Sequence, residues 1–247
     1  MNENRKVYRL FCGDWIVFYS LIFSSIFSSP CHAKIVLAEL FTGEWCQFCP
    51  NSSEKLSNLS TRYGDDEFLF LEYHYSDRLS IPETEERITY YNVTEFPTVF
   101  LNGEVKVVGE LDAATDMYER FFLTLSGEAE TASFSNTRTV RQPDQIEIQI
   151  TFHSLDARNS PSLYLRCVLF EDKQPKYPRT IRAVQNKPIL IVEPNGYLNE
   201  SFIFPLDPNW DHERLGIVFF LQEDQMHKII SSASFKMINI RNYMMFD

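Results

Sequence analysis

The sequence predicts a two-part fold, an α/β layer followed by an all-β antiparallel sandwich-like part, because two patterns of residues succeed one another along the chain. Residues 35–125 alternate continuous apolar runs with segments of helical spacing, which is typical of an α/β protein with buried strands. After Gly127, short apolar or alternating runs are separated by Pro, Asn, Asp and Gly, which is typical of antiparallel strands. We therefore expect domains at 34–128 and 129–247.

The first part is expected to begin with a strand and a helix. The run IVLAELF, residues 35–41, is broken only by Glu39, as in a strand buried on both faces. Pro50 suits a first helical turn, and apolar residues recur at helical spacing up to Gly64, which ends the segment. A second apolar strand, EFLFLEYHY, follows at 67–75.

A helix, a hairpin and a further helix complete the first part. Residues 82–93 predict a helix. They start with a proline, and the acidic residues in their first turn would be stabilised by the positive end of the helix dipole. The segment 96–109 predicts a hairpin with Asn102-Gly103 as its two-residue turn. Residues 111–125 have the pattern of an amphipathic helix. The segment WCQFC therefore follows a central strand, at the end of the sheet where α/β proteins place their sites.

The second part contains no convincing helix, and its runs predict short strands of an antiparallel sandwich. These runs are SFSNTRTV (133–140), QIEIQITFHS (145–154), SLYLRCVLFED (162–172), AVQNKPILIV (183–192), YLNESFIFPL (197–206) and LGIVFFLQED (215–224).

The first 33 residues have the pattern of a secretory signal peptide. Basic residues precede a 13-residue apolar run from Trp15 to Phe27, and Cys31 with Ala33 forms a small-residue cleavage site. The run is shorter than the ~20 residues of a spanning helix. We expect a cleaved signal at 1–33 and no membrane span in the mature chain, with an uncleaved membrane anchor or a misread start site as the alternatives.

Charge and cysteine content exclude some classes of function. The formal net charge is −11 and lysines and arginines form no cluster, so nucleic acid is not an expected partner. Beyond residue 33 the cysteines are Cys46, Cys49 and Cys167, too few for a fold stapled by disulfides. One close pair points to local chemistry, whereas Cys167 lies in an apolar run and is expected to be buried.

The pair Cys46 and Cys49 has three interpretations. At a helix N-terminus, exposed N–H groups and the helix dipole stabilise a thiolate, so Cys46 could act as a nucleophile and Cys49 could resolve the mixed disulfide. A permanent structural disulfide is the second interpretation. A metal site is the third, but a closed zinc site needs four ligands and one CxxC supplies two, so we expect no metal and no cofactor. A metal role for His74 is not favoured either.

Two separated motifs resemble the thioredoxin-like superfamily. The segment LFTGEWCQFCP (40–50) matches the W-C-x-x-C-P signature, and FPTVFLNG (96–103) matches its x-Pro-Thr segment. With its β-rich tail, the chain is similar to exported bacterial thioredoxin-like proteins of the outer-membrane-protein type. The resemblance implies a thioredoxin-like fold for the first part and a catalytic Cys46–Cys49 disulfide. It also implies a cis proline at Pro97 beside the pair and substrate positioning by Trp45, Phe96, Pro97 and Thr98.

The sequence departs from the family in two places. Gln47 and Phe48 stand between the cysteines instead of the Gly-Pro of thioredoxins or the His of oxidising periplasmic relatives, so the direction of electron flow is not indicated. Glu39 is the candidate for the buried acid that accepts a proton from the second cysteine, but it lies seven residues before Cys46 rather than six. The alternative is a Glu39 that faces solvent or pairs with a lysine.

The functional hypothesis is an exported thiol-disulfide oxidoreductase that acts on protein thiols or disulfides of the cell envelope. We expect it in the periplasm or at the outer membrane of a bacterium, or secreted. The alternative is a non-catalytic periplasmic or surface binding protein in which the Cys46–Cys49 bond is structural and the β-rich part carries recognition. The oligomeric state is not predicted.

Overall fold

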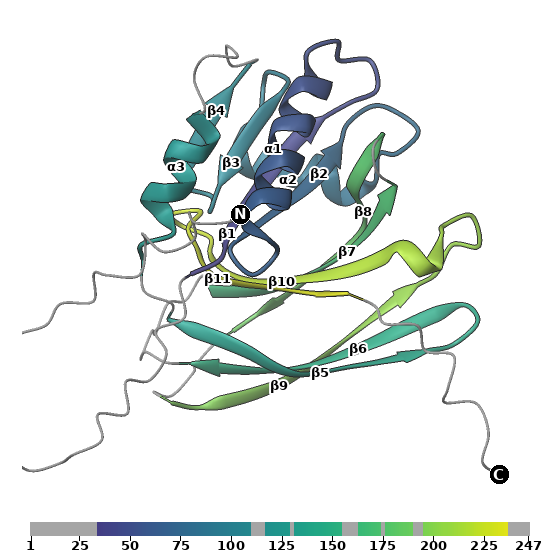
Figure 1. Cartoon of the computed structure of the whole chain (residues 1–247). Coiled ribbons are helices and arrows are strands. Elements are labelled where there is room, and N and C mark those ends of the chain that lie inside the picture. Colours follow the sequence, from purple (N-terminus) through teal and green to yellow (C-terminus); the bar gives the residue numbers. More distant parts are fainter. Residues whose placement is uncertain are drawn as a thin grey trace, which may run out of the picture. The chain divides into compact units, whose positions relative to one another are not determined.

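The computed structural model of the protein describes residues 34–109, 117–128, 131–154, 163–173, 176–189 and 195–236, which belong to one compact unit. The predicted signal peptide, 1–33, and the first part of the predicted helix at 111–125 lie outside the described residues. Within the described ranges, strands form two sheets and α-helices accompany the larger one (Figure 1).

The elements follow the chain in this order: β1 (Val36–Thr42), α1 (Cys49–Tyr63), β2 (Phe68–His74), α2 (Pro82–Tyr91), β3 (Thr98–Leu101), β4 (Val105–Val108), α3 (Met117–Leu125), β5 (Ala132–Arg141), β6 (Gln145–Ser154), β7 (Leu163–Lys173), β8 (Tyr177–Pro188), β9 (Tyr197–Pro205), the 3-10 turn η1 (His212–Arg214), β10 (Leu215–Glu223) and β11 (Ile229–Lys236).

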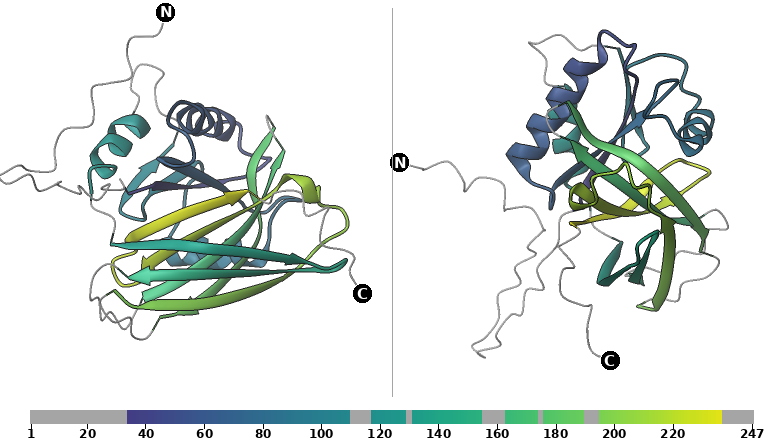
Figure 2. Two further views of the ribbon diagram at one scale, coloured as in Figure 1. Left: turned by 60° about the horizontal axis from the view of Figure 1, so that its bottom comes forward. Right: turned by 90° about the vertical axis from the view of Figure 1, so that its right-hand side faces the viewer.

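The larger sheet has eight strands in the order β11-β10-β7-β8-β2-β1-β3-β4, and the smaller has three in the order β5-β6-β9. β1 runs parallel to β2 and antiparallel to β3, which continues into the β3–β4 hairpin. β8 runs parallel to β2 and joins it to the antiparallel strands β7, β10 and β11. Figure 2 shows the smaller sheet stacked on this second half of the larger one.

The predicted fold class, an α/β thioredoxin-like domain followed by a separate all-β sandwich-like domain, is wrong. Strands dominate the structure, and four of those that follow residue 128 lie in the same mixed sheet as β1–β4. The junction is the parallel pair of β2 and β8 at Glu72 and Thr180. Periodicity identifies strands but not their partners, so it could not show that β2 pairs with a strand more than a hundred residues later. The domain bounds 1–33, 34–128 and 129–247 stay predictions.

The predicted Asn102-Gly103 turn lies between β3 and β4, but three residues, 102–104, join the strands, because Leu101 pairs with Val105. Asn102 and Gly103 both have positive φ, 47° and 70°, as the primed turns of hairpins require. The Asn102 side-chain oxygen accepts a hydrogen bond from the Leu37 N–H at 2.9 Å, and the Asn102 carbonyl accepts one from Ile229 N–H at 2.8 Å. The turn therefore ties β1 to the start of β11.

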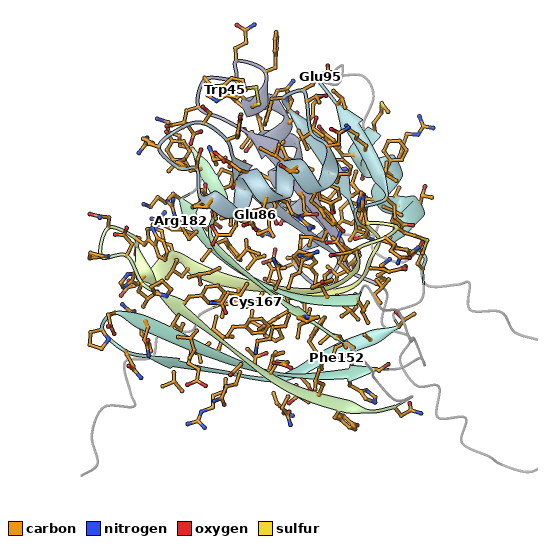
Figure 3. The ribbon with its side chains drawn as sticks, turned by 180° about the vertical axis from the view of Figure 1, so that it is seen from behind. Trp45, Glu86, Glu95, Phe152, Cys167 and Arg182 are labelled. Carbon is orange, nitrogen blue, oxygen red and sulfur yellow. A yellow bond between two sulfur atoms is a disulfide. The ribbon has the colours of Figure 1, made fainter. Side chains whose placement is uncertain are left out.

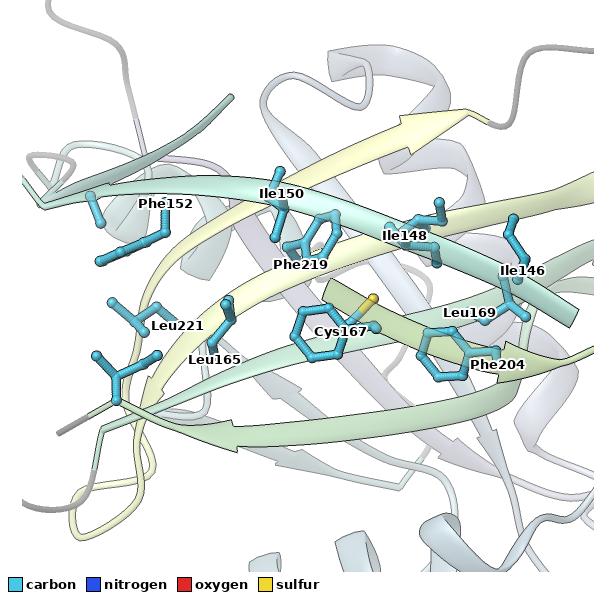
Figure 4. Close-up of a cluster of buried hydrophobic side chains, with 14 of the residues drawn as sticks. Ile146, Ile148, Ile150, Phe152, Leu165, Cys167, Leu169, Phe204, Phe219 and Leu221 are labelled. Atoms are coloured by element: carbon cyan, nitrogen blue, oxygen red, sulfur yellow. The ribbon is translucent and has the colours of Figure 1, made fainter. Parts of the chain in front are cut away.

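Three buried clusters hold the sheets together. The first packs α1 and α3 against one face of β1–β3, and the second packs the other face against α2 and residues of β7 and β10. The third lies between the two sheets and contains Phe152, Phe219 and Cys167 (Figure 4). Cys167 is fully buried there, as expected. No helix within the described ranges has the length and apolar character that crossing a membrane requires.

Candidate functional site: the Cys46–Cys49 disulfide

The two cysteines are joined by a disulfide where β1 gives way to α1. Cys46 lies in the loop after β1, Cys49 is the first residue of α1, and their Cα atoms are 5.5 Å apart, within the usual range for a disulfide. Cys46 is 7% exposed and Cys49 1% exposed. An incoming sulfur atom therefore has better access to Cys46.

The start of α1 leaves backbone donors available to a thiolate. Phe48 at the N-cap makes no side-chain capping bond, and the first turn holds no acidic residue. The first N–H groups of a helix have no partner within the helix, and the helix dipole places partial positive charge there. This end of α1 can therefore stabilise negative charge on the sulfurs.

An exposed aromatic surface surrounds the disulfide. Trp45 is 53% exposed and Phe48 48% exposed, and the ring of Trp45 meets Phe96 edge to face with centroids 5.2 Å apart. Tyr75 stacks on Phe96 at 5.5 Å, and its carbonyl accepts a 2.8 Å hydrogen bond from Trp45 Nε1. A Cβ atom at Gly43 would lie 2.6 Å from the same Nε1, so only glycine leaves room for the indole.

Three of the predicted substrate-positioning residues, Phe96, Pro97 and Thr98, lie where the loop after α2 enters β3, and the fourth, Trp45, directly precedes Cys46. The Phe96–Pro97 peptide bond is cis, and the register of β3 with β1 places Thr98 opposite Phe41, next to the end of β1. Thr98 is buried, and its hydroxyl donates to the Glu95 carbonyl at 2.7 Å. Thr98 thus fixes the loop, whereas Trp45 and Phe96 present rings at its surface. Figure 3 shows Trp45 and Glu95 at the same end of the molecule.

Glu39 lies on the other face of β1. Alternation along the strand directs Leu40 toward α1 and Glu39 toward α2, where Arg87 Nε and Nη2 each donate to one of its oxygens at 2.8 Å. Tyr91 donates a further bond at 2.6 Å. Burial raises the pKa of Glu39, but Arg87 and these hydrogen bonds outweigh it and hold that pKa below its usual value. The proton-acceptor role stays a prediction, and Glu39 pairs with an arginine rather than with a lysine or solvent.

Sequence reasoning missed a second buried carboxyl group, which lies on the α1 face of β2. The Ser53 hydroxyl, one helical turn after Cys49, donates to Glu72 Oε1. Nε2 of His74 lies 3.6 Å from Glu72 Oε2, and its Nδ1 lies 2.8 Å from Asp77 Oδ2. Burial raises the pKa of Glu72. Burial lowers the pKa of His74, but the two carboxylates outweigh it and raise that pKa. The available signal was two polar residues alternating in an apolar strand.

A groove lies away from the disulfide, and the described residues contain no cluster of metal-ligating side chains. Within them, no group of three or more His, Cys, Asp or Glu side chains could hold a metal ion. A groove of ≈900 Å³ lies between the C-terminal end of α1 and residues of β7, β8 and η1. Arg179 in its wall is already bound to Ser60 and Asp65.

The comparisons with known proteins give a fold relationship. No family model matches the sequence. A solved structure described as HBP35 of Porphyromonas gingivalis has 18% sequence identity and a TM-score of 0.68, covering 83% of this chain and 75% of that chain. The chain shares the fold of HBP35.

Two further solved structures are more distant than HBP35. A domain of the outer membrane lipoprotein Omp28 from Porphyromonas gingivalis has 13% identity and a TM-score of 0.34, covering 43% of this chain and 87% of that chain. A malarial protein has 17% identity and a TM-score of 0.28, covering 38% of this chain and 99% of that chain. Neither carries weight for function.

Proposed function

We propose that the chain is a thiol-disulfide oxidoreductase that acts through Cys46 and Cys49. The observation that carries the proposal is the position of the disulfide, which joins Cys46, the more exposed of the two buried cysteines, to the uncapped first turn of α1. The W-C-x-x-C-P and x-Pro-Thr motifs support the same disulfide-exchange chemistry as that of exported bacterial thioredoxin-like proteins. We place the chain in the periplasm, at the outer membrane or outside the cell of a bacterium.

The reaction is a two-step exchange. A thiolate of the partner protein attacks Sγ of Cys46, the Cys46–Cys49 bond breaks, and Cys49 leaves as a thiolate. A second thiolate of the partner then attacks the partner's sulfur atom in the mixed disulfide. This forms the partner's disulfide and releases Cys46 as a thiolate. The partner loses two electrons and two protons, and the Cys46–Cys49 pair gains them. The same steps in reverse reduce a partner disulfide, with Cys46 as attacking thiolate and Cys49 as resolving thiolate.

Protein segments are the substrates that the surface fits. Trp45 and Phe48 expose rings beside the disulfide and the partly buried Phe96 contacts Trp45, and covering such aromatic surface with an apolar side chain is favourable. The backbone at Phe96, held by the buried Thr98, can pair with an extended peptide. We therefore propose cysteine-containing segments of envelope or secreted proteins with an apolar residue near the cysteine.

Glu72 is a better candidate than Glu39 for holding the proton of Cys49. It bonds to Ser53 on α1, on the same face of the sheet as Cys49, and burial raises its pKa, which favours a carboxyl group that holds a proton. Glu39 lies on the opposite face and is neutralised by Arg87. Replacing Glu72 with Gln should slow release of the mixed disulfide by at least about tenfold and change its pH dependence.

The reduction potential of the pair tests the function. We expect equilibration in glutathione buffers to give a value within about −120 to −270 mV, the span of working exchange proteins. Cys46→Ser should abolish exchange, and Cys49→Ser should accumulate mixed disulfides. A potential below about −300 mV, together with inertness toward small thiols, would mark the disulfide as structural and support the binding-protein alternative.

A further inference from the structure

The loop before Cys46 is tied to the second half of the chain through one carboxylate, that of Glu44. Arg78 Nε, after β2, donates to both carboxylate oxygens at 3.0 Å. The hydroxyl of Tyr177, the first residue of β8, donates to Glu44 Oε1 and accepts a hydrogen bond from Arg78 Nη2 at 2.8 Å. The guanidinium of Arg78 also lies over the Tyr177 ring, 5.1 Å from its centroid. These three side chains close a triangle of contacts.

The same loop is held at its backbone. Glu44 N–H donates to Asp77 Oδ2 at 2.8 Å, and Cys46 N–H donates to the Gly43 carbonyl at 3.0 Å. These bonds come from within the first half of the chain. The bond from the Tyr177 hydroxyl to Glu44, by contrast, comes from beyond residue 128. β8 therefore adds one side-chain contact to a loop whose backbone is already held by the first half of the chain.

The charge of Glu44 gives this contact a chemical consequence. Glu44 lies two residues before Cys46, so its negative charge opposes a thiolate on that sulfur unless a cation stays beside it. Arg78 supplies the cation, and Tyr177 bonds to both partners. Other charged or titratable groups around the triangle include Asp77, Lys176 over the Tyr177 ring, and His74 edge to face with that ring.

We propose that Tyr177 is a positioning residue for the Cys46–Cys49 pair: its hydroxyl holds Glu44 against Arg78 and so fixes both the loop and the charge beside Cys46. This inference rests on the proposed function, and it gives the second half of the chain a part in that function. Loss of the hydroxyl frees the carboxylate from one partner and leaves the exposed Glu44–Arg78 pair to move apart. The Cys46 thiolate then forms less readily.

The test removes the hydroxyl group alone. In full-length chains carrying Cys49→Ala, the rate of alkylation of Cys46 by iodoacetamide is measured across pH, with the modified peptide quantified by mass spectrometry. Tyr177→Phe should move the midpoint of this profile to higher pH and slow the reaction at pH 7 by about threefold, the scale of an exposed charge interaction. The matched control is Tyr197→Phe, an exposed tyrosine on β9, which should leave the profile unchanged.

A double-mutant cycle separates the proposed route from a general loosening of the fold. In chains carrying Glu44→Gln, adding Tyr177→Phe should change nothing further, because the hydroxyl acts through that carboxylate. Equal profiles for Tyr177→Phe and the parent would overturn the proposal, and so would an undiminished effect of Tyr177→Phe in the Glu44→Gln chain. Alkylation needs no partner protein. A pair that fails to exchange with glutathione would therefore refute the proposed function while leaving the effect of Tyr177 measurable.

Discussion

Glu39 and Arg87 form a buried bidentate ion pair on the face of β1 opposite α1, with two nitrogen–oxygen distances of 2.8 Å. Arg87 also packs over the rings of Tyr90 and Tyr91. A charge enclosed in this way is stable only with its partner, because removal of one member leaves the other buried and unpaired. The pair therefore anchors α2 to the sheet.

We expect that breaking the Glu39–Arg87 pair lowers the stability of the fold strongly and leaves disulfide exchange unchanged. Glu39→Gln should lower the free energy of unfolding by about 3–5 kcal/mol in urea denaturation, because Arg87 loses its counter-charge. Arg62→Gln, which breaks the exposed Arg62–Glu119 pair, is the control and should cost about 0–1 kcal/mol. If Glu39→Gln instead left stability intact and altered the pH dependence of mixed-disulfide release, Glu39 would be the proton acceptor after all.

Glu72 predicts a pH dependence of stability with a defined sign. Its folded pKa lies above the ordinary value of 4.5, so the folded state holds this proton more tightly than the unfolded state does. Its contribution to stability is present below pH 4.5 and is lost as the pH rises through the folded pKa. The side chain of Glu72→Gln stays neutral at every pH. The free energy of unfolding of this variant should therefore increase relative to that of the wild type as the pH rises through the folded pKa of Glu72. Urea denaturation of both proteins from pH 4 to pH 8 measures the difference, and two parallel curves would contradict the prediction.

The aromatic surface predicts a separation of protein substrates from small ones. Trp45→Ala should raise KM for a cysteine-containing protein segment by about tenfold, because an exposed aromatic anchor is worth roughly 1.4 kcal/mol or more. Its rate with a small dithiol should stay close to that of the wild type. Tyr197→Ala removes an aromatic ring of comparable exposure from the smaller sheet and serves as the control. Equal losses for both kinds of substrate would show that Trp45 acts on the disulfide itself.

Cys167 predicts a closed core between the two sheets. Burial raises the pKa of this thiol well above its ordinary value, and the side chain is enclosed by Phe219 and its neighbours. Thiol reagents should modify Cys167 only when the chain unfolds. Phe152→Ala, which empties part of the same cluster, should cost about 3–5 kcal/mol and advance labelling to lower urea concentrations. Ile203→Ala on the exposed face of β9 should leave the labelling curve unchanged.

The sequence identified elements whose signal is local. The apolar run of β1, the Asn102-Gly103 turn and the CxxC motif each lie within a few residues, and all three were found. β11 was missed because it reads IISSASFK, with small and polar residues at its centre. Its buried hydroxyls are satisfied by backbone carbonyls, with Ser231 donating to Ala132 and Ser232 to Ile35. A polar strand of this kind has no apolar pattern to detect.

The site was predicted in part for the same reason. The CxxC spacing identifies Cys46 and Cys49, and the two motifs identify the residues next to them. Tyr177 lies 133 residues from Glu44, so its contact exists only once β8 pairs with β2. Glu72 was read as part of a strand, because nothing in the sequence shows that it faces Ser53. The misjudged fold class and the missed contact of Tyr177 share one cause, the unrecognised pairing of β2 with β8.

The continuous sheet also constrains the order in which the chain can reach its native state. β2 leaves one edge without its partner until β8 arrives, and the bond from Ser232 to the Ile35 carbonyl spans 197 positions. Closing such distant contacts carries an entropic cost that slows folding, and an uncovered strand edge invites pairing with other chains. An emerging chain thus presents its cysteines long before the strands that complete their surroundings exist. Truncation near residue 128 should yield an aggregating fragment rather than a working module.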